Sequence, residues 1–190
     1  MKRLSYFFLG ALLLAGCGTQ KTVVQPTEPV AADTPVVQKP VVYDVEAHPD
    51  VVSVAEAIAL LDNPGNAAAI AKKHSYKVAG KYGIYRLDNY DMMMYKNCRL
   101  PKKLGTDIYE DTPKPLAKGT SSYIAINSNV LIAVFNNTAF NNLVEQVKGL
   151  GFALVEEGYE DKYSNGQTDI YVYSARKSIR IEKAISSSSY

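Results

Sequence analysis

The stretch that decides the fold is SYIAINSNVLIAVFNNTAFNNLVEQVKGL, residues 122–150. It begins with two runs rich in β-branched residues on either side of Asn127-Ser128-Asn129, which is typical of a tight hairpin turn. From residue 138 to residue 150 the apolar side chains recur at helical spacing, and this predicts a helix that ends at Gly149 or Gly151. A hairpin followed by an amphipathic helix indicates an α+β domain, in which an antiparallel sheet carries helices packed on one face.

Further elements are expected on both sides of this stretch. Ser53 and Glu56 form a capping-box pattern, in which each side chain can bond a backbone N–H at a helix start, and Asn66 can cap a second short helix that ends at His74. We expect residues 100–121 to be a solvated connection, with a contact loop as the alternative. Tyrosine and β-branched residues predict strands at 76–79, 83–87, 91–97, 122–127, 130–135, 152–157, 168–174 and 178–183.

Two parts of this body resemble each other. Residues 66–78 align with 142–154, and residues 91–95 align with 169–173. Each unit would be a helix followed by antiparallel strands, and two such helix-plus-strands repeats would share one sheet. Any helix followed by a hairpin gives a similar pattern, so the duplication is a hypothesis.

The composition limits the class of protein. The chain has 190 residues, 47% of them hydrophobic, with 21 Lys and Arg against 19 Asp and Glu, which suits one globular domain. Lys2 and Arg3 lie in a segment that we expect to be removed, so the mature chain is neutral. A neutral chain lacks the cationic surface that nucleic acid requires, and we expect no nucleic-acid partner.

The N-terminus carries a targeting pattern. A basic start, Met1-Lys2-Arg3, is followed by an apolar run from Leu4 to Ala15. This run would rise only about 18 Å as a helix, short of the roughly 30 Å of a bilayer core, so it is typical of a signal peptide. Leu14-Ala15-Gly16-Cys17 resembles the lipobox of bacterial lipoproteins, which implies cleavage before Cys17 and acylation of its sulfur. Ordinary signal-peptidase cleavage and an uncleaved signal anchor are the alternatives.

The lipoprotein resemblance also implies a location. Gly18, in place of Asp, follows the acylated Cys17, which favours anchoring in the outer membrane of the cell envelope, facing the periplasm. After Cys17, prolines are interspersed with Val, Thr, Gln and Ala, which predicts an extended linker without its own core, although one valine pair could add an edge strand. The expected organisation is a signal peptide (1–16), a lipidated Cys and Pro/Val-rich tether (17–50), a single α+β domain (51–184) and a flexible tail (185–190).

No residue set predicts catalysis, a metal or a cofactor. His48 and His74 are not accompanied by a nucleophile motif, and we expect His74 at a helix end rather than as a catalytic base. Cys98, the only thiol outside the lipobox, is expected to be buried and inert. Two histidines and one thiol are too few for a zinc site. The acidic stretches 88–91 and 156–161 lack the spacing of a calcium loop and are expected to be solvated hairpin loops.

Tyrosine is the most distinctive residue of the body. Tyr171 and Tyr173 alternate with Ile170 and Val172 on one predicted strand, so the two tyrosines point to the face that the helices leave open. Together with Tyr95 they are candidate ligand-binding residues for a glycan or a protein partner, because tyrosine offers apolar area and a hydroxyl. The alternative is that tyrosine is simply a favourable strand residue.

A second resemblance concerns the C-terminal part. Residues 130–135, 143–152 and 168–174 resemble part of a sporulation-related repeat domain, which implies binding to peptidoglycan glycan strands, although the second helix of that repeat is missing after Ser174. We therefore expect an envelope lipoprotein with a non-catalytic binding or assembly domain, whose partner is the membrane and an envelope protein or peptidoglycan. The alternative is a peptidoglycan- or glycan-binding protein, or a carbohydrate-directed hydrolase whose carboxylate pair no pattern identifies.

Overall fold

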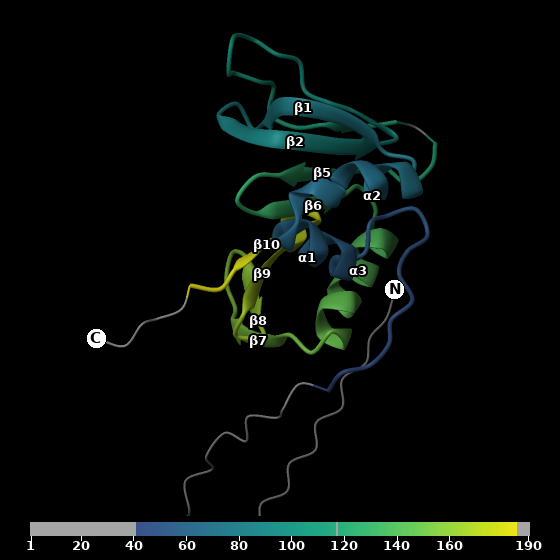
Figure 1. Cartoon of the computed structure of the whole chain (residues 1–190), viewed down its shortest axis with the longest axis vertical. Helices are drawn as coiled ribbons and strands as arrows, with labels where there is room; N and C mark the ends of the chain where they lie inside the picture. The colour runs from purple at the N-terminus through teal and green to yellow at the C-terminus, as the bar shows by residue number, and fades with distance from the viewer. Residues whose placement is uncertain (1–40, 117, 186–190) are drawn as a thin grey trace, which may run out of the picture. The chain divides into compact units, whose positions relative to one another are not determined.

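The computed structural model describes residues 41–116 and 118–185, which form one large antiparallel sheet and three α-helices (Figure 1). The α+β class expected from the sequence is confirmed. The expected signal peptide (1–16), Cys17, the tether up to residue 40 and residues 186–190 of the expected tail lie outside the described residues. None of the helices in the described ranges is both long and apolar enough to span a membrane.

The helices and strands follow one another in a simple order. The helices are α1 (Val54–Asp62), α2 (Ala67–Lys73) and α3 (Asn137–Gly149), with 3-10 turns η1 (Pro64–Asn66) and η2 (Ser174–Arg176). The main sheet contains β1 (Lys77–Ile84), β2 (Asp88–Lys96), β5 (Ser122–Ile126), β6 (Val130–Val134), β7 (Ala153–Glu156), β8 (Asp161–Ser164), β9 (Thr168–Tyr173) and β10 (Ser178–Lys183). A separate two-stranded ladder joins β3 (Cys98–Arg99) to β4 (Lys114–Pro115).

The sheet has two halves with the same connectivity. Its strand order is β1-β2-β5-β6-β10-β9-β8-β7. In the first half α2 leads into the meander β1-β2-β5-β6, and in the second half α3 leads into β7-β8-β9-β10. The last strands of the two halves pair antiparallel in the middle, with Val130 opposite Ile181 and Ala133 opposite Ser178.

This topology tests the repeat hypothesis. Residues 66–78 and 142–154 are both a helix followed by the outer strand of a meander, so their alignment fits the architecture. The alignment of 91–95 with 169–173 was wrong. Those segments lie in the second and the third strand of their meanders, and a five-residue strand pattern is too short to distinguish the two.

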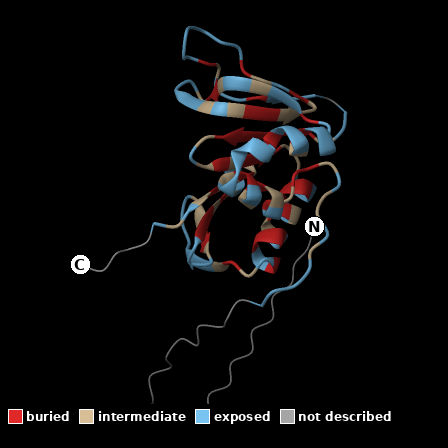
Figure 2. Cartoon of the chain, in the orientation of Figure 1, coloured by how far each residue is buried: buried red, intermediate tan, exposed pale blue. Residues whose placement is uncertain are grey.

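All three helices pack on one face of the sheet. The larger core cluster contains residues of every helix together with sheet residues such as Ile124, Ile132 and Ile170. Side chains alternate along each strand, so these isoleucines face the helices while their neighbours face the other way. Figure 2 shows buried residues where α3 and the strands face each other and exposed residues on the outer sides of the helices.

The second face of the sheet is covered only over its first half. The segment that connects β2 to β5 folds back over a smaller core cluster that includes Ile84, Met93 and Cys98. Tyr109 of this segment is 1% exposed, and its ring lies 4.9 Å from that of Tyr82. Most residues of the segment 100–121 are exposed, as expected of a solvated connection, but an aromatic anchor, Tyr109, packs it onto the sheet.

Two strand expectations also needed correction. Most of the segments 76–79 and 83–87 belongs to one strand, β1, since Lys81 with a φ of 49° distorts the strand without changing its register against β2. Residues 85–87 form the turn that follows it. Of the two expected acidic hairpin loops, residues 88–91 lie in β2, and the loop 156–161 ends where β8 begins at Asp161. That strand is short and polar, so alternation of apolar residues does not reveal it.

Residues 43–52 form a strap along α3, which we call the N-terminal strap. The Tyr43 N–H donates to the Gly149 carbonyl at 3.0 Å. A Cβ on Gly149 would lie 2.7 Å from the Tyr43 carbonyl oxygen, so glycine permits this close approach. Asn142 accepts a hydrogen bond from the His48 N–H at 2.8 Å and donates to the Glu46 carbonyl at 2.9 Å. The last residues assigned to the tether thus pack on the domain, and Val41-Val42 belongs to no strand.

Candidate functional site

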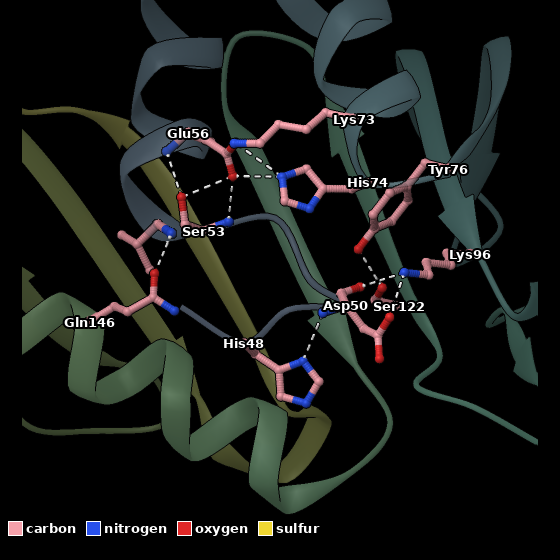
Figure 3. Close-up of polar contacts among 11 residues, drawn as sticks. His48, Asp50, Ser53, Glu56, Lys73, His74, Tyr76, Lys96, Ser122 and Gln146 are labelled. Atoms are coloured by element: carbon pink, nitrogen blue, oxygen red, sulfur yellow. Dashed lines mark hydrogen bonds and ion pairs between the residues drawn. The ribbon is translucent and has the colours of Figure 1, made fainter. Parts of the chain in front are cut away.

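A dense polar cluster lies where α1 meets α2 (Figure 3). The Glu56 carboxylate accepts hydrogen bonds from the Ser53 N–H and hydroxyl at 3.0 Å, and it contacts Lys73 at 2.6 Å and His74 at 3.0 Å. Burial disfavours the charge of Glu56, but the bonds to His74, Lys73 and Ser53 outweigh it and lower its pKa to about 2. The capping box expected from the sequence is confirmed.

This cluster does not have the geometry of a catalytic triad. In nucleophilic catalysis the histidine reaches the hydroxyl and the carboxylate orients the histidine. Here the carboxylate of Glu56 lies between Ser53 and His74. The Ser53 oxygen also accepts the Glu56 N–H at 3.2 Å as the helix cap. His74 caps the end of α2, as expected, and its side chain is only 13% exposed. We conclude that the cluster fastens α1 to α2.

The other contacts in Figure 3 fix the strap and the sheet. Asp50 pairs with Lys96 at 2.9 Å. The Gln146 side chain accepts a hydrogen bond from the Val54 N–H at 2.9 Å, and its own amide donates to Asn142. These side chains bond each other and the backbone, which suits a structural role.

Four carboxyl groups of the described residues have a clearly shifted pKa, and none of the four shifts favours the protonated form. Hydrolysis of a glycosidic bond needs one carboxyl group that stays protonated near neutral pH. The pKa is clearly shifted for Asp50, Glu56, Glu145 and Asp169, and in all four it is lowered. Within the described ranges, no three or more His, Cys, Asp or Glu residues are grouped as a metal site would require.

The expected tyrosines do share one face of the sheet. Tyr171 and Tyr173 on β9, and Tyr95 on β2, alternate with residues that face the helices. However, β5, β6 and β10 separate Tyr95 from β9, a distance of roughly 19 Å at the usual strand spacing. Tyr95 also packs against the cluster beneath the loop. The structure thus brings Tyr171 and Tyr173 together and leaves Tyr95 apart.

A continuous set of aromatic and cationic side chains surrounds Tyr171 and Tyr173. Arg180 lies 4.1 Å from the Tyr171 ring, and Tyr159 stacks on Tyr173 at 4.5 Å. Arg176 lies 4.3 Å from the Tyr85 ring and 5.8 Å from the Tyr173 ring. We call this surface the tyrosine–arginine face. Its members are Tyr85, Tyr123, Tyr159, Tyr171, Tyr173, Arg176 and Arg180.

The face has a groove beside Tyr85 and Arg176. Ladder pairing places Tyr123, Ala133, Ser178 and Tyr173 in one row across four strands. Of this row, Tyr123 and Ala133 line the groove, Tyr123 is only 3% exposed, and Tyr173 lies outside the lining. The groove has a volume of about 180 Å³, and its lining includes Tyr85, Tyr123, Ala133, Phe135 and Arg176.

The backbone at the rim of this groove is held in an unusual conformation. Tyr85 has a φ of 52° and Lys177, next to Arg176, has a φ of 51°. Left-handed backbone is costly for residues other than glycine and persists only where surrounding contacts impose it. The Tyr85 hydroxyl bonds that of Tyr123 at 2.8 Å, and the Tyr85 N–H donates to the Asp111 carbonyl. These contacts hold the Tyr85 ring beneath Arg176.

Arg176 gives the groove its charge. Burial raises the pKa of Tyr123, with a further contribution from Tyr85, so this hydroxyl stays neutral. Arg180 is paired with Glu160 at 2.8 Å and with Glu182 at 2.5 Å. Within the described residues Arg176 has no carboxylate partner, so it is the unpaired cation of the face.

Sequence reasoning missed the groove. The alternation of Tyr123 with Ile124 in a predicted strand was sufficient to place Tyr123 on the open face. Tyr85 and Arg176 lie in turns, where no periodicity indicates the direction of a side chain. The strands that flank these turns pair in the sheet, and this pairing brings Tyr85 and Arg176 together.

Comparisons of the chain with protein-family models, with curated protein sequences and with solved structures found no match.

Proposed function

We propose that this chain is a bacterial envelope lipoprotein whose folded domain is a non-catalytic binding module. The lipobox-like sequence supports acylation of Cys17, and two or three acyl chains anchor a protein stably. Gly18 supports placement in the outer membrane, facing the periplasm. The partner is then an envelope component that the domain contacts from its anchored position.

The tyrosine–arginine face is the observation that carries this proposal. Tyrosine and arginine dominate binding surfaces because both provide large contact area together with hydrogen-bond donors. The loop that buries the first half of this sheet face does not reach Tyr171 and Tyr173, which are half-buried, while Tyr159 is 78% exposed. A prebuilt, partly exposed aromatic surface is suited to a flat partner such as a sugar ring.

A photo-crosslinking experiment in native cells tests the binding module. A photoreactive phenylalanine replaces Tyr159 in the full chain, and the matched control carries the same group at Ala59, which is exposed on α1. We expect an adduct from position 159 that is absent from position 59. Glycan or muropeptide adducts support the cell-wall form of the proposal, and adducts with one envelope protein support the assembly form. Equal labelling from the two positions contradicts a binding role for the face.

The anchor is tested separately with Cys17→Ala. We expect the unchanged chain in the membrane fraction, with an N-terminal mass that includes acyl chains. We expect the variant to lose both the acyl mass and the membrane fractionation. An unchanged mass of the N-terminal peptide in the two chains contradicts lipidation at Cys17.

A further inference from the structure

The groove of the tyrosine–arginine face combines a neutral aromatic wall with one unpaired cation. Its volume of about 180 Å³ is below the roughly 300–1,000 Å³ typical of pockets that enclose a whole small molecule. It therefore accommodates one ring or one charged group of a larger ligand. The remainder of such a ligand would extend over Tyr173 and Tyr159.

Arg176 is oriented by its aromatic neighbours. Its guanidinium lies over the Tyr85 ring at 4.3 Å and near the Tyr173 ring at 5.8 Å. A guanidinium that stacks on a ring keeps its N–H groups directed outward at its edge, where they can donate two parallel hydrogen bonds to an anion. Stacking on Tyr85, whose backbone is itself held in the left-handed region, limits the conformations that binding would have to fix.

The charges around the groove favour an anion. The other arginine of the face, Arg180, is neutralised by Glu160 and Glu182. Arg86, on the same turn as Tyr85, pairs with Asp111 at 3.0 Å. Arg176 alone keeps its positive charge available within the described part of the face.

From this arrangement we infer that the groove binds the carboxylate of an acidic sugar, with the guanidinium of Arg176 on the carboxylate and the sugar ring against Tyr85 and Phe135. This inference rests on the proposed binding function and specifies its ligand. Two features carry it together: the charge selects an anion, and the rings of Tyr85 and Phe135 with the hydroxyl of Thr112, which line the groove, select a carrier with flat apolar faces and hydroxyl groups.

A pair of sugars that differ by a carboxylate provides the test. N-acetylmuramic acid and N-acetylglucosamine differ by a lactyl group with its carboxylate. We would titrate each into the purified full chain in detergent and follow the binding by NMR chemical-shift changes. We expect about tenfold tighter binding of the acidic sugar, as one charge-assisted bidentate contact provides. The resonance of the Arg176 Nε–H should shift with the acidic sugar.

Variants then assign the preference to one side chain. Arg176→Gln should remove the preference, so that the variant binds the two sugars with equal affinity. Arg86→Gln, which changes an arginine already paired with Asp111, should leave the preference intact.

Several results would overturn the inference. These are equal binding of the two sugars, a preference that survives Arg176→Gln, and tighter binding of inorganic phosphate or of an acetylated dipeptide with a free carboxylate. The inference is also overturned if neither sugar binds. Crosslinking from position 159 detects a partner of any chemistry, so the proposed binding function is judged independently of these outcomes.

Discussion

Replacing Glu56 by Gln should destabilise the domain at neutral pH and have little effect in strong acid. The substitution preserves the size of the side chain and removes the charge that holds Lys73 and His74. The pKa of Glu56 is about 2 in the folded protein against an ordinary value of 4.5, a difference equivalent to roughly 3 kcal/mol. Because a fifth of the side chain remains exposed, solvent screens part of this energy, and we expect a loss of about 1.5 kcal/mol.

The direction of the pH dependence follows from the lowered pKa. The contribution of Glu56 is complete above the unfolded-state pKa of 4.5 and is lost as the pH falls through about 2, where the folded protein also protonates the carboxylate. Urea unfolding of the two full chains, measured from pH 7 to pH 2 by circular dichroism, gives the difference in unfolding free energy at each pH. That difference should shrink towards zero in acid.

A control variant separates this effect from a general effect of charge. Asp111→Asn removes one member of an ion pair with Arg86 in which both side chains are about 70% exposed, and it should cost only a few tenths of a kcal/mol. An equal loss at pH 7 and pH 2 for Glu56→Gln would refute the reasoning, because the stabilisation would then not depend on the charge. A loss of unfolding free energy at pH 7 that is no larger for Glu56→Gln than for Asp111→Asn would also refute it.

Two further predictions concern the loop-covered half of the sheet. Gly83→Ala should destabilise the protein by about 1–3 kcal/mol, because its Cβ would lie 2.3 Å from the Tyr109 ring, whereas Gly80→Ala, with no atom within 4 Å of the new Cβ, should change the thermal midpoint little. Equal thermal midpoints for the two variants would show that the loop moves away from the new Cβ without loss of stability. Cys98 is buried, which raises its pKa to about 11, so at pH 8 a thiol reagent should label it about 100-fold more slowly in the folded than in the denatured chain. Comparable rates would show that the thiol is accessible.

Local patterns were sufficient to predict the elements that decide the class of this fold. Ser53 and Glu56 form the expected capping box, and the helix expected from residue 138 is α3 (Asn137–Gly149). The alternation around Tyr171 and Tyr173 placed both on the face away from the helices. These features depend on residues close in sequence, whose spacing directly determines geometry.

The features that the sequence did not reveal depend on contacts between distant residues. The loop before β5 was expected to be solvated because its composition is polar, while one buried tyrosine, Tyr109, anchors it. The groove beside Arg176 is lined by residues far apart in the sequence, such as Tyr85, Tyr123 and Phe135, and only the folded chain brings them together. Tyr85 takes part through a left-handed turn that no propensity rule predicts for tyrosine.

The position of β10 has a consequence for how the protein folds. It is the last strand of the described chain, yet it occupies the middle of the sheet, between β6 and β9. Until residues 178–183 are in place, β6 and β9 both have an unpaired edge, and no strand of one half is paired with a strand of the other within the described residues. The chain can form its local helices and hairpins early, but assembly of the whole sheet waits for its final strand.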